Sequence, residues 1–244
     1  GSPDFAVLLN FEAGGFLSAV PSSGAGGGNG VPGNALHDVD LDGHLDVLHS
    51  KALFRNLGTG TFGAAEPYAS GFIGIYDLTA ADVTLDGWPD ILGVGHSDKY
   101  GWSLLPSDGA GGFGPPQALR TCDLARNIST GDVDFDGDPD VVVANSTSLN
   151  VSVHLNESGT FSLPSVLPTG YSAKYVEAGD LNGDGALDLL AADASVYHFF
   201  GDGQGGFVTT TTAPGLGTLQ NPTLRDLNAD GSPDLFAPTS PGLA

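Results

Sequence analysis

Short apolar runs alternate with polar turns along the whole chain, and this alternation predicts an all-β fold. Several runs begin with aspartate and continue as aliphatic residues, for example "DILGVG", "DVVVAN" and "DLLAAD". A second set, such as "WSLLPS" and "VSVHLN", follows a few residues later. None of these runs is long enough, or regular enough at the helical period, to indicate a helix.

Two further runs complete each unit. One begins at a phenylalanine and often meets proline, as in "FGAAEP", and proline is compatible with an edge strand. The other precedes the next acidic stretch, as in "NISTG". Four short strands in a unit of about 40–50 residues predict the blade of a β-propeller.

Two sequence markers repeat with the same period. An acidic nonapeptide with the pattern D-x-[DNT]-x-D-G-x-x-D occupies residues 38–46, 82–90, 132–140, 180–188 and 226–234. A glycine-rich turn ending in phenylalanine alternates with it, at Phe16, Phe62, Phe113, Phe161 and Phe207. Two independent markers in strict alternation indicate a repeat architecture.

The repeat predicts a single domain over residues 1–244, a five-bladed β-propeller of four-stranded antiparallel blades. The chain begins on a run of the second set and ends just after an acidic loop and its strand. We therefore expect the N-terminal outer strands to pair with the C-terminal inner strands in one shared blade. Such pairing would close the ring and remove exposed sheet edges. The alternative is that this chain, which has no Met and starts at Gly1-Ser2, is a segment of a larger ring.

Each acidic loop offers a dense set of hard oxygen ligands. Positions one, three, five and nine supply side-chain oxygens, position seven supplies a backbone carbonyl, and glycine at position six permits a sharp turn. Such a set suits Ca²⁺ better than zinc, so we expect about five calcium ions, one in each blade. The predicted metal ligands are Asp38, Asp40, Asp42, His44, Asp46, Asp82, Thr84, Asp86, Trp88, Asp90, Asp132, Asp134, Asp136, Asp138, Asp140, Asp180, Asn182, Asp184, Ala186, Asp188, Asp226, Asn228, Asp230, Ser232 and Asp234.

The loops are not EF-hands, because position twelve is never glutamate and lies within the strand that follows. Magnesium, which needs a small octahedral site, and an acidic turn without an ion are the alternatives to calcium. The first and third loops have four aspartates at the side-chain ligand positions, whereas Thr84 makes the second loop the weakest predicted site. Asp138 is expected to bind only through its carbonyl, with its side chain in solvent.

Composition and charge narrow the class of protein. The chain carries a formal charge of −22 with only 7 basic residues, which argues against binding to nucleic acid or to an anionic membrane. No apolar run is long enough for a membrane span, and a lone cysteine excludes an internal disulfide. Calcium loops of extracellular affinity would be empty in the cytosol, so a secreted, extracellular or cell-surface location is expected.

The repeats resemble the FG-GAP/VCBS family, the calcium-loop blades of integrin α-subunit propellers and of many secreted bacterial proteins. The resemblance rests on the five acidic loops, the G-x-F turns and joins such as "DGDPDVVVAN", and it covers nearly the whole chain. It implies a calcium-stabilised propeller used for binding or adhesion. Such propellers commonly have seven blades, whereas five units are counted here.

The loops opposite the acidic loops are the expected ligand-binding face. They hold most of the tyrosines and most of the few cations, and aromatic rings with polar neighbours suit sugar rings. The predicted ligand-binding residues are His96, Lys99, Tyr100, Trp102, Tyr76, Tyr171 and Tyr175. The alternative is that these aromatic side chains pack between blades and that the cations only dilute the charge.

These observations predict a lectin-like binding module, monomeric by default, whose partner is a carbohydrate or a cell-surface protein. No G-x-S-x-G elbow, P-loop or H-E-x-x-H motif is found, so no catalytic residue is assigned and an enzyme is not expected. The alternatives are a polysaccharide-processing lyase or hydrolase and a structural spacer domain of a larger surface protein.

Overall fold

The computed structural model describes the side chains of most of the chain. These are residues 34–49, 52–68, 75–95, 101–119, 124–193, 195–209, 219, 222–229, 231 and 233–237. It also describes the backbone of residues 120 and 210–212 and of four short strands between residues 5 and 22.

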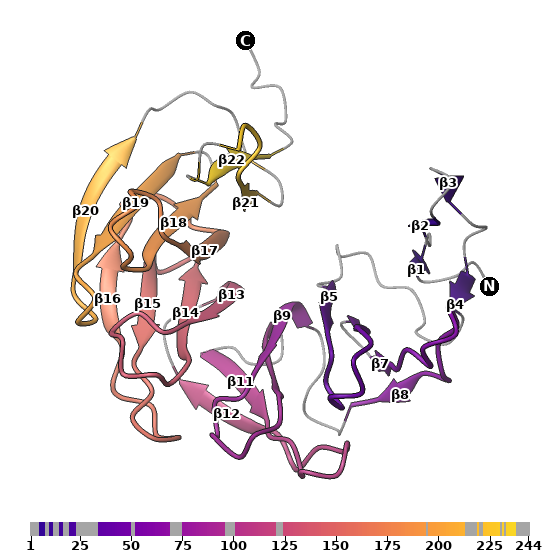
Figure 1. Ribbon diagram of the computed structural model, residues 1–244. Coiled ribbons are helices and arrows are strands. Elements are labelled where there is room, and N and C mark those ends of the chain that lie inside the picture. The colour runs from indigo at the N-terminus through magenta and orange to yellow at the C-terminus, as the bar shows by residue number, and fades with distance from the viewer. Residues whose placement is uncertain are drawn as a thin grey trace.

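Four antiparallel four-stranded sheets follow one another along the chain as blades (Figure 1). The first blade contains β5 (Asn34–His37), β6 (Asp46–His49), β7 (Ala52–Phe54) and β8 (Glu66–Pro67). The second contains β9 (Ile75–Ala81), β10 (Asp90–Gly95), β11 (Gly101–Leu105) and β12 (Gln117–Arg120). The third contains β13 (Ala125–Gly131), β14 (Asp140–Asn145), β15 (Asn150–His154) and β16 (Ser165–Pro168). The fourth contains β17 (Tyr175–Gly179), β18 (Asp188–Ala192), β19 (Val196–Gly201) and β20 (Phe207–Thr212).

Two smaller pieces lie at the ends of the chain. β21 (Thr223–Arg225) pairs with β22 (Asp234–Phe236). The N-terminal strands form one hairpin, in which β1 (Phe5–Val7) pairs with β4 (Val20–Ser22), and β2 (Asn10–Phe11) pairs with β3 (Gly15–Phe16). The all-β fold and the four-stranded blades are confirmed. Closure of a five-bladed ring stays a prediction, because the hairpin and the β21–β22 pair lie at opposite ends of an open arc and are not paired in the described part of the chain (Figure 1).

The apolar core lies between the blades. Every residue of β10, β14 and β15 is buried, because each blade is covered on both faces by its neighbours. One cluster joins Leu48 of the first blade to Ile91 of the second, and another joins Val94 of the second blade to Val143 of the third. This burial on both faces explains why the apolar runs do not alternate with polar residues.

The innermost strands β9, β13 and β17 are joined by hydrogen bonds in which side chains of one strand reach the next strand. The Asp77 carboxylate accepts hydrogen bonds from Asn127 Nδ2 at 2.6 Å and from the Ile128 amide at 3.1 Å. Asn127 Oδ1 in turn accepts the Val176 amide at 2.6 Å. Burial raises the pKa of Asp77 to about 6 despite these bonds. These contacts connect consecutive blades at the central axis, where no ladder of strand pairing joins them.

The meander order of each blade also fixes two loop faces. The connections from first to second strand and from third to fourth strand emerge at one end of every blade, and the other connections emerge at the opposite end. In the described part of the chain, no helix is long and apolar enough to cross a membrane.

Candidate metal loops and the opposite loop face

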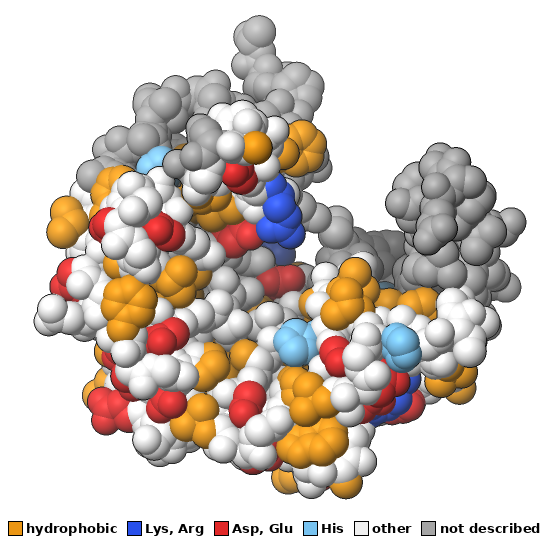
Figure 2. Space-filling view, in the orientation of Figure 1, with side chains coloured by type: hydrophobic (Ala, Val, Ile, Leu, Met, Phe, Trp, Pro, Cys, Tyr) orange, Lys and Arg blue, Asp and Glu red, His pale blue; other side chains and the backbone are white. Residues whose placement is uncertain are grey.

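Each acidic loop joins the first strand of a blade to the second. The ninth position is the first residue of the second strand, at Asp46, Asp90, Asp140, Asp188 and Asp234. The loops and the glycine-rich turns therefore share one face, as predicted. Figure 2 shows acidic side chains spaced around the arc of the molecule and a hollow at its centre.

The glycine at position six has a positive φ in every loop, between 89° and 96°. A side chain there would meet nothing within 4 Å, so backbone conformation alone requires glycine. Position four has a positive φ as well, which the sequence pattern did not reveal. Its occupants include Leu41, Leu85 and Phe135, for which a left-handed backbone costs about 1–2 kcal/mol.

The carboxylates of the first and third loops converge. Asp38, Asp40 and Asp42 form one cluster, and Asp132, Asp134 and Asp136 form another, with one ligand oxygen from each residue within 4.8 Å of the others in its cluster. In each cluster one buried carboxylate oxygen has no hydrogen-bond partner, Oδ1 of Asp40 and Oδ1 of Asp132. Such oxygens are costly unless a cation or water meets them, so both clusters fit a hard cation.

Backbone amides hold the ligand side chains in place. In the first loop the Asp38 carboxylate accepts the amides of Asp42 at 3.0 Å and Gly43 at 2.8 Å, and Asp42 accepts the amide of His44 at 2.8 Å. The bond from the glycine amide to the first aspartate recurs in all five loops. The loops are therefore folded around their own carboxylates.

The ninth aspartate has a structural role that the sequence pattern did not reveal. Asp140 is fully buried; its Oδ2 accepts the Val133 amide at 2.8 Å and its Oδ1 accepts the Asn156 amide at 2.8 Å. The same pair of bonds occurs at Asp46, Asp90 and Asp188. This carboxylate therefore joins its loop to the end of the third strand, and its role as an ion ligand stays a prediction.

Burial and charge raise the pKa of several loop carboxyls. Burial raises the pKa of Asp140 to about 6, and it also raises the pKa values of Asp46 and Asp90. The pKa of Asp134 is raised by burial and then by the charge of Asp136. The third loop therefore holds negative charge that its own surroundings do not compensate.

Other loop residues differ from expectation or lie outside the described part of the chain. The Asp138 side chain is only partly exposed, and its Oδ2 accepts the Ser158 amide at 2.8 Å, a contact that was not expected. The Thr84 hydroxyl donates to Asp90 at 3.4 Å. Asp230 and Ser232 of the fifth loop lie outside the described residues.

Each of the first three acidic loops lies against the glycine-rich turn of the next blade. Asn156 Nδ2 in the third blade donates to the Val83 carbonyl in the second loop at 3.0 Å. A Cβ on Gly203 in the fourth blade would lie 2.6 Å from the Phe135 ring of the third loop. We use the term seam for this junction between one loop and the next turn, which is where ion binding would act on the packing of blades.

The structure describes only some of the predicted ligand-binding residues, and it does not place all of those on the surface. His96, Lys99 and Tyr100 lie outside the described residues. Trp102 is 0% exposed and packs edge-on against Phe161, so the prediction that it contacts a ligand is wrong. It belongs to β11, as the run "WSLLPS" predicted, and it fills the core between the second and third blades.

Three tyrosines remain as candidates. The Tyr76 ring lies 4.3 Å from the Arg126 guanidinium on the inner strands, and Tyr175 lines a cavity of about 320 Å³ beside β13 and β21. Tyr171 is 66% exposed at the connection between the third and fourth blades.

Tyr171 stands close in sequence to a partly exposed ion pair that the repeat pattern did not predict. Lys174 Nζ donates to Asp193 Oδ1 at 3.0 Å, and Asp193 is nearly buried. Thr169 fixes the backbone next to Tyr171. Its hydroxyl donates to the Tyr171 carbonyl at 2.6 Å, and its amide donates to the Leu149 carbonyl at 2.9 Å. The opposite face thus combines an exposed aromatic ring with fixed charged groups.

Comparison with known proteins identifies one matching family and several solved structures that are similar to this chain. A family model described as an FG-GAP-like repeat matches residues 38–93, 82–143 and 132–191. No curated protein gives a significant match. Among solved structures, an Agrocybe aegerita lectin that specifically recognises non-reducing terminal N-acetylglucosamine is 26% identical, covers 84% of this chain and 59% of its own, and has a TM-score of 0.62.

Two further structures share less. BBS1N, solved in complex with ARL6DN, is 11% identical over 80% of this chain and 60% of its own, with a TM-score of 0.54. The V. cholerae biofilm matrix protein Bap1 is 19% identical over 85% of this chain and 34% of its own, with a TM-score of 0.46. The chain thus spans about three fifths of the length of the first two structures.

Proposed function

The chain belongs to the FG-GAP-like repeat family, and we propose that it is a calcium-stabilised β-propeller that binds carbohydrate. The observation that carries this proposal is its similarity to the Agrocybe aegerita lectin over 84% of the chain. The proposal for this chain is limited to carbohydrate as a class of ligand, and it does not include the particular sugar that the lectin recognises. Fold similarity alone would not support a function, so the site must be tested directly.

Calcium is the proposed resident ion of the five loops. The side chains that would hold it are the aspartates at positions one, five and nine and the residue at position three. Position three is aspartate in the first and third loops, threonine in the second and asparagine in the fourth and fifth. The ion would neutralise carboxylates that otherwise repel one another. The converging clusters and their partnerless buried oxygens support this role. Affinity of the extracellular kind would place the working protein outside the cell.

A fifth blade is proposed to close the ring. The N-terminal hairpin and the β21–β22 pair are the two halves that a four-stranded blade requires. Their union would cover the edge of β22. Removing residues 1–22 is then expected to lower the melting temperature, and an unchanged melting temperature would argue for an open arc.

The proposed ligand surface is the face opposite the acidic loops. Tyr171 offers an exposed ring on which a sugar could stack, and the ion pair with buried Asp193 orients the Lys174 amino group as a hydrogen-bond donor. We propose that this described part of the face contacts the glycan. His96, Lys99 and Tyr100, which lie outside the described residues, stay further candidates.

A glycan array probed in calcium and in EDTA tests the function. We expect binding to a defined set of glycans that is lost in EDTA and weakened at least ten-fold by Tyr171→Ala. Leu163→Ala is the matched control, because Leu163 is 94% exposed on the other face. Silence on all glycans would overturn the proposal in favour of a spacer domain, and turnover of a polysaccharide would favour the lyase or hydrolase.

A further inference from the structure

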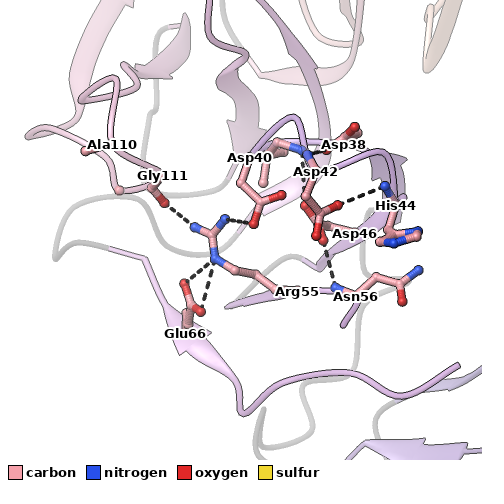
Figure 3. Close-up of polar contacts among 12 residues, drawn as sticks. Asp38, Asp40, Asp42, His44, Asp46, Arg55, Asn56, Glu66, Ala110 and Gly111 are labelled. Carbon is pink, nitrogen blue, oxygen red and sulfur yellow. Dashed lines mark hydrogen bonds and ion pairs between the residues drawn. The ribbon is translucent and has the colours of Figure 1, made fainter. Parts of the chain in front are cut away.

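A single arginine connects the first acidic loop to the second blade. Arg55 follows β7, and its Nη1 donates to Asp40 Oδ2 at 2.8 Å (Figure 3). Its Nε donates to both oxygens of Glu66 at 3.2 Å, and its Nη2 donates to the carbonyl of Gly111 in the next blade. The guanidinium thus holds one oxygen of a predicted calcium ligand, while Asp40 Oδ1 stays without a partner.

The guanidinium keeps its charge in this position. Burial alone would lower the pKa of Arg55, but the hydrogen bond to Asp40 and the charge of Glu66 outweigh it and raise the pKa overall. The side chain is 17% exposed, so solvent screens its charge less than it would screen that of a surface arginine.

The third loop has the same four aspartates but no such cation. Asn56 and Asn156 occupy equivalent positions, since their amides donate to the ninth aspartates of the two loops. The residue before Asn156 is Leu155, which packs against Gly205 of the next turn as Arg55 contacts Gly111. Among the described residues, no ion pair reaches the third loop.

We propose that Arg55 is a tethered counter-cation that lowers the calcium affinity of the first loop below that of the third. The inference rests on the proposed calcium binding and deepens it, because it assigns different affinities to loops with identical ligand side chains. A positive charge one side chain away from a divalent ion weakens its binding roughly three- to ten-fold in a water-like dielectric. Arg55 also pairs with one oxygen of Asp40 when calcium is absent, so the first seam depends less on the ion.

A calcium titration followed by two-dimensional ¹H–¹⁵N NMR tests the proposal on the full chain. The amides of Gly43 and Gly137 report the two loops separately, because they donate to Asp38 at 2.8 Å and to Asp132 at 3.0 Å. We expect Gly137 to reach half-saturation at a roughly three- to ten-fold lower calcium concentration than Gly43. Arg55→Leu should move the Gly43 midpoint towards that of Gly137, and Leu155→Arg should raise the Gly137 midpoint.

Arg55→Lys is the matched control, because it keeps the charge and should keep the Gly43 midpoint within about two-fold of the original. If Arg55→Leu does not fold, Leu155→Arg on the other seam still decides the question. Equal midpoints in the unaltered protein, or midpoints that neither leucine–arginine exchange moves, would overturn the role of Arg55. If no loop amide responds to calcium, the proposed function fails instead.

Discussion

The first and third acidic loops have the same ligand side chains, but their surroundings differ. The first loop shares Asp40 with a guanidinium that also contacts the second blade. The third loop instead closes its seam with apolar contacts, Phe135 on Gly203 and Leu155 on Gly205. Residues outside the repeated motif therefore determine how much negative charge each loop leaves for an ion to neutralise.

Removing calcium should have the largest effect on stability, and it should weaken the third seam more than the first. If each loop binds calcium with a dissociation constant of about 10⁻⁴–10⁻³ M, millimolar calcium contributes roughly 2–7 kcal/mol over five loops. We expect EDTA to lower the melting temperature by several degrees. Hydrogen exchange should increase more in the turn at 203–207 than in the turn at 109–113. An unchanged melting temperature would contradict calcium stabilisation.

Asp140→Ala should destabilise the protein by about 2–5 kcal/mol in both calcium and EDTA. It leaves the Val133 and Asn156 amides unsatisfied in the core, and each costs about 1–3 kcal/mol. Asp46→Ala should behave alike, because this bond pair is common to both loops. Asp136→Ala is the control, because Asp136 is exposed and should matter only in calcium. Urea unfolding in the two buffers measures the difference.

The pH dependence of the calcium-free protein should also distinguish the loops. The pKa of Asp140 is about 6 in the folded protein and about 3.9 in an unfolded chain, so the folded state binds the proton more tightly. Stability in EDTA should therefore rise by about 1–2 kcal/mol as the pH falls from 7 to 4.5.

Asp140→Asn should remove more of that rise than Asp46→Asn. With calcium present the trend should reverse, because protons then compete with the ion. Thermal melting at four or five pH values provides the measurement, and a loss of stability on acidification in EDTA would contradict it.

The smallest effect should come from the turn glycines. Gly111→Ala and Gly205→Ala both place a side chain at positive φ, 86° and 76°, which costs about 1 kcal/mol. The new methyl would lie 3.9 Å from Arg55 in the first case but 2.9 Å from Leu155 in the second. We therefore expect Gly205→Ala to cost up to about 1 kcal/mol more. Equal losses in chemical denaturation would show that Leu155 moves aside freely.

The sequence was sufficient for the blades and for the position of the loops. Apolar runs and acidic loops at a constant period identify local elements, because each strand is buried by its immediate neighbours. It did not distinguish Trp102 in the core from Tyr171 on the surface, since both stand near polar loop residues. It also missed Arg55, because a contact with Gly111 depends on which blade lies next to which. Closure of the ring depends likewise on pairing between distant ends of the chain.

The seams have a consequence for how such a chain can lengthen or shorten during evolution. Each of the first three acidic loops is complementary to the turn of the following blade, and the apolar clusters also join neighbouring blades. A duplicated segment one period long contains one acidic loop and one glycine-rich turn, so each can pair with its counterpart in a neighbouring copy. Repeats can therefore be gained or lost without inventing a new interface.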